Sequence, residues 1–413
     1  MRRLVHAVIA AIALAGLPAA TASAEELKAE VLHWWTSGGE SAAVKQFADQ
    51  FNKAGGVWID TAIAVGENAR AAGVNRIVGG NPPTAMQFNT GKQFDDLIKQ
   101  GLLSNLDDVA EEDHWKEILP KAFLDSVTRD GHIYAVPVNN HGQNWLWYNK
   151  AVFDKAGVKL PESWEEFFFA ADKLKAAGFI PLALGGQPWQ ERLTFSTVLL
   201  SDGGKELYFK VYRDLDLDAI KSPEFKKVVE TFGKLRGLVD EGSPNRNWND
   251  AAALLISGKA AMQFMGDWEK GEFIAAGWTA GKEYGCLLGP GERNFMMGGD
   301  VFVFPKVTDP NQIKAQKLLA HVMLAPDTQV LFNNKKGSVP VRLDVDTSKM
   351  DACAQVAIKV LSDKSQQIPS TDMLISPDLT GSLNDIVAEY WSNPKMSADE
   401  FVAKFVDAVK AAS

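Results

Sequence analysis

The sequence predicts an α/β fold divided into two lobes. Strand-like runs alternate with amphipathic helical stretches through most of the chain, which favours mainly parallel sheets covered by helices. The 413 residues exceed the size at which one hydrophobic core keeps growing, so two domains are expected. No internal repeat or low-complexity linker separates two halves of the sequence, which indicates that ordered strands cross between the lobes.

The N-terminus has the three parts of a secretory signal peptide. Arg2 and Arg3 precede an apolar run over residues 4–20, and Ala22-Ser23-Ala24 supplies a small-residue cleavage site. We therefore expect residues 1–24 to be removed, with Glu25 as the first mature residue. The apolar run is too short for a membrane span, although an anchoring helix that stays attached is the alternative. This pattern predicts an exported protein of the periplasm.

Charge and cysteine content narrow the classes of partner. The net charge of -9 becomes more negative when the two arginines are removed, and such a surface repels nucleic acid and anionic lipid. No nucleic-acid partner is expected. Cys286 and Cys353 are the only cysteines, and in an oxidising compartment they can form one disulfide or remain two buried thiols.

The first predicted strand ends in Trp34-Trp35, and a helix follows a glycine-containing loop. Val44, Phe47 and Phe51 recur at helical spacing, and Gly55-Gly56 ends this helix. Large aromatic side chains placed where a strand opens into a helix face a cleft more readily than a core. Because the apolar face of a sugar ring stacks well on an indole, the tryptophan pair indicates carbohydrate recognition.

Two capping boxes mark later helices. Ser163 with Glu166 predicts a helix over residues 167–177, and Ser397 with Glu400 predicts the last helix. The apolar residues of the last helix form one stripe, and both helices are expected to pack on a core.

Two β-rich runs that end in proline are candidate crossings between the lobes, at residues 134–138 and 301–305. Proline is unsuited to a central strand but suits the place where a strand leaves its sheet. The expected N-terminal lobe then takes residues 25–137 plus 303–345. The expected C-terminal lobe takes residues 138–302 plus 346–413.

Further short motifs follow one another in a characteristic order: residues 34–40, 136–141, 144–149, 265–268, 298–300 and 335–342. Together with the exported N-terminus they resemble the extracellular solute-binding proteins of carbohydrate ABC transporters. The likeness covers essentially the whole mature chain and is strongest to the glucose-type monosaccharide-binding branch. It implies a two-lobed periplasmic binding protein fold with a multi-crossing hinge, one bound sugar, a membrane permease as partner, and a monomer without cofactor.

The resemblance places aromatic residues from both lobes in the site. Trp34 and Trp35 lie in it, although successive strand side chains point to opposite faces and one of the two can equally be a core residue. Trp268 from the second lobe would complete a sandwich around the sugar when the lobes close.

Three charged residues are expected to bind sugar hydroxyl groups. Glu40 can accept paired hydroxyls, although a carboxylate at a helix start is also stabilised by the helix dipole. Asp300 follows two glycines that let a ligand approach the backbone, and a simple turn residue is the alternative. Lys336 matches the family's cationic donor, with Lys335 beside it leaving the register open by one residue.

The remaining candidates are Gln87, Lys92, Asn140 and His141. Gln87 and Lys92 flank a polar turn beyond the carboxyl end of a strand, where α/β proteins bind ligands, although Lys92 also suits a solvated surface. Asn140 and His141 follow the first crossing. A neutral imidazole both donates and accepts a hydrogen bond, which suits a hydroxyl-bearing ligand, whereas a structural histidine is the alternative. The histidine spacing fits no metal site.

One segment departs from the glucose-binding pattern. Some glucose-binding relatives carry a late histidine after a Pro-Ser pair, whereas here Pro369-Ser370 leads to Thr371-Asp372-Met373. This difference leaves room for another hexose, an amino sugar, a polyol or a small glycoside.

The leading function is therefore a sugar receptor and not an enzyme. The rival is a secreted glycosidase that uses Glu40 and Asp300 as its carboxylate pair, which requires the two carboxyl groups to lie about 5–9.5 Å apart and one of them to have a raised pKa. A structural or adhesive protein fits poorly with a chain that lacks repeats.

Overall fold

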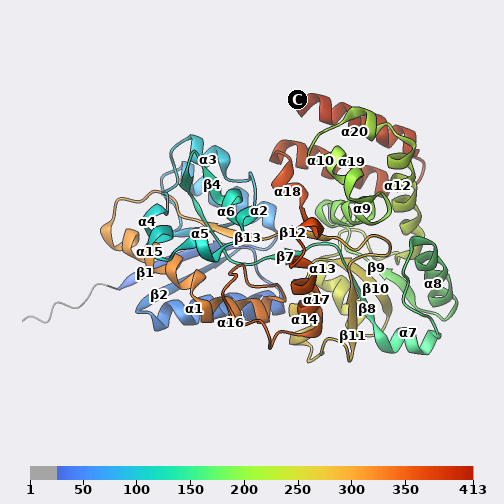
Figure 1. Cartoon of the computed structure of the whole chain (residues 1–413), viewed down its shortest axis with the longest axis horizontal. Coiled ribbons are helices and arrows are strands. Elements are labelled where there is room, and N and C mark those ends of the chain that lie inside the picture. Colours follow the sequence, from blue (N-terminus) through green and yellow to red (C-terminus); the bar gives the residue numbers. More distant parts are fainter. Residues whose placement is uncertain (1–25, 413) are drawn as a thin grey trace, which may run out of the picture.

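The structure of this protein, a computed structural model, describes residues 26–412. The predicted signal peptide at residues 1–24 lies outside them. Two lobes of mixed helix and sheet lie side by side, and residues far apart in the sequence share the first lobe, where early strands and late helices meet (Figure 1). The predicted two-lobed α/β architecture is confirmed. Among residues 26–412, no helix has the length and apolarity that a membrane crossing needs.

The first lobe is built on a sheet with the strand order β2-β1-β3-β13-β6. Its strands are β1 (Leu27–His33), β2 (Gly56–Ala62), β3 (Ala85–Asn89), β6 (Ala135–Pro137) and β13 (Asp300–Val303). Its helices are α1 (Gly38–Lys53), α2 (Gly66–Val78), α3 (Asp95–Lys99), α4 (Asp107–Glu112), α5 (Trp115–Ile118), α6 (Lys121–Val127), α15 (Pro310–Leu324) and α16 (Pro326–Lys336), with the hairpin β4 (Thr128–Arg129) and β5 (His132–Ile133). Strands β1, β2 and β3 run parallel, and β13 runs antiparallel to β3 and β6.

The second lobe has a sheet with the order β11-β8-β10-β9. Its strands are β8 (Trp145–Asn149), β9 (Ile180–Ala183), β10 (Ala260–Met265) and β11 (Tyr284–Leu287). The helices before β11 are α7 (Lys150–Ala156), α8 (Trp164–Ala176), α9 (Pro188–Asp202), α10 (Gly204–Tyr212), α11 (Leu217–Ile220), α12 (Pro223–Lys234), η1 (Leu235–Leu238), α13 (Trp248–Ile256) and α14 (Glu269–Ala275). The helices after it are α17 (Ala352–Leu361), η2 (Lys364–Gln366), α18 (Thr371–Leu374), α19 (Pro377–Ser392) and α20 (Ala398–Ala412).

Local signals account for the helix starts. The Ser37 side chain accepts a hydrogen bond from the Glu40 backbone, and the Glu40 carboxylate accepts one from the Ser37 backbone, so a capping box opens α1. At the predicted boxes of α8 and α20 the serine half is present, because the Ser163 and Ser397 side chains accept from the Glu166 and Glu400 backbone. The Glu166 carboxylate accepts from the Glu162 backbone, one residue before the N-cap. The buried side of α1 carries Phe47 and Phe51, as their spacing predicts.

The chain passes between the lobes on paired segments. Strand β6 leads directly to β7 (His141–Gly142), and β12 (Phe295–Gly298) leads directly to β13, while β14 (Gln367–Pro369) pairs with β12 in a small third sheet. Strand β13 pairs within the first sheet. Residues 300–302 therefore lie in the first sheet, whereas the sequence analysis placed them in the second lobe. The cause is that β13 begins at Asp300, one residue after the end of β12 and before the apolar run that served as the signal.

A disulfide bond links two segments of the second lobe. Cys286 on β11 is bonded to Cys353 on α17, across 67 residues of sequence. Of the two alternatives that the sequence left open, the bridge is the one observed. It ties the segment that returns from the first lobe to the edge of the second sheet.

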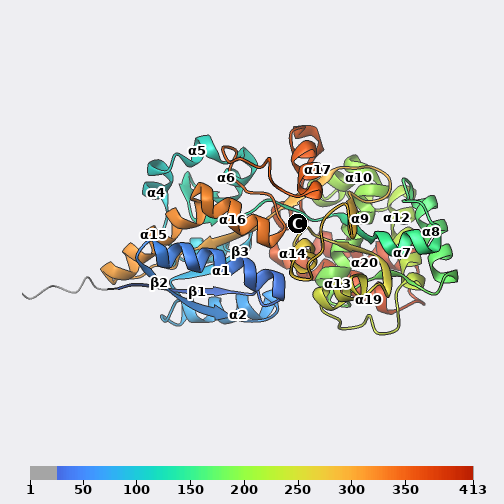
Figure 2. The ribbon, with the colours of Figure 1, turned by 90° about the horizontal axis from the view of Figure 1, so that it is seen from below.

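The two lobes touch where α1 meets α14. The backbone N–H of Gly39 donates to Glu272 Oε1 of α14 at 2.8 Å, so a side chain of the second lobe occupies a free donor at the start of α1. Gly39 and Gly271 lie backbone to backbone, because a Cβ atom on Gly39 would come within 2.3 Å of the Gly271 carbonyl carbon. Figure 2 shows α14 beside α1 and α16, between the two lobes.

We predict that Gly39→Ala pushes α1 and α14 apart. The added methyl group meets backbone that cannot turn aside, so the free energy of unfolding is expected to fall by about 1–3 kcal/mol. The matched control is Gly381→Ala in α19, where no atom lies within 4 Å of the new Cβ and the gain in helix propensity is expected to raise stability slightly. Thermal and urea unfolding of the variants measure this difference. Equal stability of the two variants would contradict the close contact.

Candidate functional site

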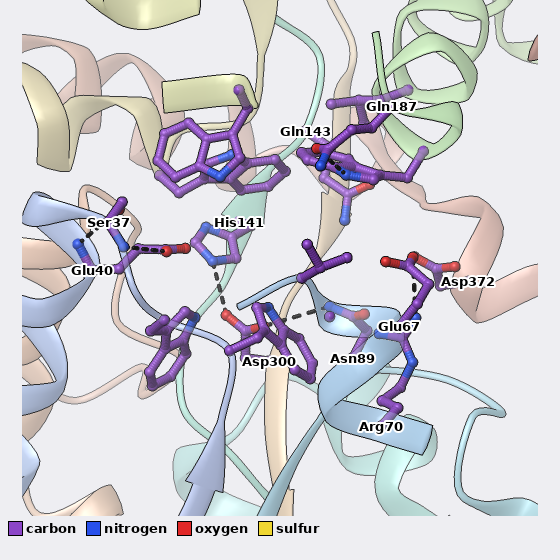
Figure 3. Close-up of a pocket in the computed structure, with 18 of the residues that line it drawn as sticks. Ser37, Glu40, Glu67, Arg70, Asn89, His141, Gln143, Gln187, Asp300 and Asp372 are labelled. Atoms are coloured by element: carbon purple, nitrogen blue, oxygen red, sulfur yellow. Dashed lines mark hydrogen bonds and ion pairs between the residues drawn. The ribbon is translucent and has the colours of Figure 1, made fainter. Parts of the chain in front are cut away.

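A cavity of about 310 Å³ opens between the two lobes. Seven of the ten residues predicted from the sequence line it, namely Trp34, Trp35, Glu40, His141, Trp268, Asp300 and Lys336. Figure 3 shows Glu40 and His141 on one side of this cavity and Glu67, Arg70 and Asp372 on the other. We call the part formed by Trp34, Glu40, His141, Trp268, Asp300 and Lys336 the inner end.

The two adjacent tryptophans differ in exposure. Trp34 is half-buried, and the Arg70 guanidinium of α2 lies 5.4 Å from its ring centroid. Trp35 is only 1% exposed and packs against Phe302 and Phe332. Since the pair follows directly on β1, one indole faces the cavity and the other fills the wall behind it. This is the arrangement that side-chain alternation predicts.

A buried ion pair lies at the inner end. Lys336, at the C-terminus of α16, donates from Nζ to Glu40 Oε1 at 3.2 Å, and both side chains are less than a tenth exposed. The ammonium also lies 5.6 Å from the Trp35 ring centroid and 5.9 Å from that of Trp268. Lys335 is exposed, so the register left open by the sequence falls on Lys336.

Asp300 has hydrogen-bond donors on both carboxylate oxygens. Oδ1 accepts from Gln87 Nε2 at 3.0 Å, and Oδ2 accepts from Asn139 Nδ2 at 2.8 Å. Gln87 also accepts from the Trp34 backbone at 3.0 Å, so it connects the first tryptophan to Asp300 from behind the cavity wall. Gln87 does not itself line the cavity and acts by positioning.

His141 lies between two carboxylates. Its Nε2 lies 3.1 Å from Asp300 Oδ2, and its Nδ1 is bonded to Asp267 Oδ1. Burial alone would lower the pKa of His141, but the two carboxylates outweigh burial and raise this pKa above its usual value. The two carboxylates therefore favour the protonated imidazole, whereas the sequence suggested a neutral ring. The physical cause is the second acid, Asp267.

Neighbouring charged and polar groups also shift the pKa of Asp300. Burial alone would raise the pKa of Asp300, but His141, Lys336 and Asn139 outweigh burial and lower it below its usual value. Asp300 is therefore ionised and accepts hydrogen bonds only. Trp268 closes the second-lobe side, with its ring edge-on to the His141 ring at a centroid distance of 5.1 Å.

Besides Gln87, two further predicted residues lie outside the cavity lining. Lys92 is exposed, and its Nζ donates to the Leu374 carbonyl of α18 at 3.1 Å, which makes a contact between the lobes. Asn140 is buried, and its backbone pairs with Val339 next to the first crossing. Both lie close in sequence to lining residues, which explains why sequence position alone did not separate them.

Several lining residues of the second lobe are not among those predicted from the sequence. Trp189 opens α9 after β9, and Trp248 opens α13, so both repeat the signal of Trp34, an aromatic residue where a helix begins. Arg192 and Asp372 also line the cavity and form an ion pair at 3.6 Å. No local pattern connects α9 with α18, so only the fold brings this pair together. Within residues 26–412, no group of histidine, cysteine and acidic side chains could hold a metal ion.

Comparison with known proteins gives the family. The sequence profile of the bacterial extracellular solute-binding proteins matches residues 35–329. A probable sugar-binding periplasmic protein of Brucella suis is 38% identical over 411 residues, covering 97% of this chain and 96% of the relative. A protein of the same description from Rhizobium meliloti is also 38% identical, with 95% and 96% covered. The chain therefore belongs to the bacterial extracellular solute-binding proteins.

Solved structures share the fold. A chitin oligosaccharide binding protein superimposes with a TM-score of 0.79 at 21% identity, covering 93% of this chain and 98% of that one. The bacterial solute receptor AcbH, described with a preference for β-D-galactopyranose, gives a TM-score of 0.78 at 20% identity, covering 93% and 97%. At this identity the likeness establishes the two-lobed fold alone.

We predict that the buried imidazolium makes stability depend on pH. Because the folded-state pKa of His141 lies above the unfolded value near ~6.5, its contribution is complete below that pH and is lost as pH rises through the folded-state pKa. The loss has a slope of up to about 1.4 kcal/mol per pH unit. Urea unfolding of the parent between about pH 6 and about pH 9 measures it.

The variant for this prediction is His141→Gln, which is expected to be less stable near the acid end of that range and to show a flatter pH dependence. The exposed His132, paired with Asp107 at 2.6 Å, provides the matched control His132→Gln, which is expected to keep the slope of the parent. Identical slopes in the parent and His141→Gln would show that His141 is not the cation.

Proposed function

We propose that this member of the bacterial extracellular solute-binding proteins is a periplasmic receptor that captures a sugar in the interlobe cavity. We propose further that it delivers the sugar to the membrane permease of an ABC importer and that it acts as a monomer. The names of the relatives from Brucella suis and Rhizobium meliloti support a sugar as ligand. For the inner end we propose a glucose-like hexose ring, with an amino sugar or a polyol as alternatives.

The observation that carries the proposal is the composition of the inner end. Exposed indole surface from Trp34 and Trp268 adjoins charged groups that already have partners of opposite charge in the protein. Stacking surface beside satisfied but still accessible donors and acceptors suits a ligand that is uncharged and rich in hydroxyl groups. A charged ligand would have to displace an existing ion pair, at a high desolvation cost.

Ligand capture is proposed to involve rotation of the lobes about their crossings. Strands β6 and β13 hold the crossings on one side, and β7 and β12 hold them on the other. Residues 26–137 with 300–345 would then move against residues 138–299 with 346–412. A ligand gains its second set of contacts, including Trp268, only when both lobes reach it.

The glycosidase alternative is disfavoured by Asp300. Glycoside hydrolysis needs one carboxyl group with a raised pKa as the acid, whereas the pKa of Asp300 is lowered and its oxygens accept from Gln87, Asn139 and His141. Glu40 is held in an ion pair with Lys336. Both carboxylates of the proposed catalytic pair are thus committed to partners.

The function is tested by calorimetry on the purified protein with glucose, galactose, mannose, glucosamine and sorbitol, together with a turnover assay on aryl glycosides. We expect saturable binding of at least one hexose and no turnover. Turnover that is lost in Asp300→Asn would make this residue catalytic and would overturn the receptor assignment. Absence of binding both across this panel and with disaccharides would do the same.

We predict that stacking and charged residues affect binding differently. Trp268→Ala is expected to weaken binding of all bound hexoses by about tenfold or more, because it removes a stacking face without removing a hydrogen bond to one particular hydroxyl. Asp300→Asn is expected to change the ranking of hexose epimers, because a buried acceptor discriminates between hydroxyl positions.

The matched controls lie on β2, outside the cavity lining. Trp58→Ala removes a half-buried indole, and Asp60→Asn removes an aspartate that is paired with His33 at 2.8 Å. Both controls are expected to bind as the parent does. An unchanged epimer ranking in Asp300→Asn would contradict the assigned role of this carboxylate.

A further inference from the structure

The cavity continues well beyond the inner end. Its other lining residues include Trp189 and Arg192 of α9, Glu67 and Arg70 of α2, and Asp372 of α18, and we call these five residues the outer part. Glu67, Arg70 and Asp372 also line an adjoining cavity of about 410 Å³. Figure 3 shows these three residues grouped across the cavity from Glu40 and His141. The cleft is therefore an elongated space with polar groups at both ends.

Two indoles of the second lobe face different ways along this space. The ring centroids of Trp189 and Trp268 lie 6.3 Å apart, and their planes are inclined by 51°. A pyranose ring stacks on an indole when the two planes are roughly parallel, so one sugar ring cannot stack on both faces. Both residues belong to the second lobe, so closure of the lobes does not change their mutual angle. The second indole face is available to a second ring.

Trp189 is held in place by hydrogen bonds. Its indole N–H donates to Gln187 Oε1 at 3.0 Å, and Gln187 in turn donates from Nε2 to Asn247 at 3.0 Å. The side chain is half-buried, which leaves indole surface free at the cavity. A rigid, partly exposed aromatic surface is pre-organised for binding, because little side-chain freedom is lost when a ligand arrives.

The charges of the outer part balance. Arg192 pairs with Asp372 at 3.6 Å, and Arg70 pairs with Glu67 at 3.3 Å. Arg192 also donates from Nε to Asn384 Oδ1 at 2.5 Å. Both guanidinium groups thus have carboxylate partners, just as Lys336 and His141 have at the inner end. A second ligand unit in contact with them is expected to be uncharged and to present hydroxyl groups.

We propose that the cleft binds a neutral glycoside of two sugar units, with one ring at the inner end and the second stacked on Trp189 between α2 and α9. This inference rests on the proposed function and specifies the ligand class of the same cleft. The first ring supplies the contacts with Asp300 and Trp268. The second ring supplies contacts that reach both lobes, through Arg70 on one side and Arg192 on the other.

The test compares mono- and disaccharides by calorimetry, using glucose, methyl glucoside, maltose, cellobiose and trehalose. We expect at least one disaccharide to bind about tenfold or more tightly than glucose. Trp189→Ala is expected to remove this gain, so that it loses more affinity for the disaccharide than for glucose, whereas Trp268→Ala weakens both ligands to a similar degree. Trp189→Phe keeps an aromatic face and is expected to recover most of the gain, and Trp58→Ala is the control with parental binding.

The calorimetric results distinguish failure of this inference from failure of the proposed function. Glucose binding with no gain for any disaccharide overturns this inference alone, as does an equal loss of glucose and disaccharide affinity in Trp189→Ala with an unchanged unfolding temperature. If Trp189→Ala fails to fold, Trp189→Phe is compared with the parent instead. A small loss of affinity for disaccharides without a loss for glucose supports the inference, and no such loss overturns it. Absence of all sugar binding in the parent overturns the proposed function and this inference together.

Discussion

The row of buried charges Asp267, His141 and Asp300 is the interaction on which the site depends. Its three members come from the end of β10, from the crossing strand β7 and from β13, so it joins both lobes through the crossing. Burying charge is costly unless each group has a partner, and here every member has at least two hydrogen-bond partners. The row therefore links strand ends of both lobes next to the crossing.

The second constraint is close backbone contact next to this row. Gly39 lies against Gly271, and Gly337 lies against the Asp267 carbonyl, where added Cβ atoms would come within 2.3 and 2.4 Å of backbone atoms. Helices α1, α14 and α16 can therefore meet beside the cavity. Because Trp268 directly precedes α14 and Lys336 ends α16, the same contact brings an indole of one lobe near an ammonium of the other.

Charge pairing along the whole cleft explains its proposed ligand class. The ion pairs at both ends leave indole faces and partnered polar groups as the accessible chemistry. Such a surface favours hydroxyl groups over ionic groups, because an ion pair resists replacement whereas a satisfied carboxylate still accepts another hydrogen bond. The planes of Trp189 and Trp268 are inclined, so each indole can stack on a different sugar ring. The proposed length of the ligand therefore depends on two residues of the same lobe.

Local sequence patterns determined the fold class and the capped helices, because caps and strand ends act over a few residues. The resemblance to carbohydrate solute-binding proteins supplied most of the inner end. Tertiary structure alone decided that the pKa of His141 is raised, since Asp267 lies 126 positions away in sequence. It likewise decided that Gln87 supports Asp300 from behind and that Cys286 is bonded to Cys353. The Arg192–Asp372 pair joins α9 to α18, and no pattern within either helix specifies such a contact. The physical reason is that hydrogen bonds and ion pairs depend on distance in space, which the order of residues does not specify.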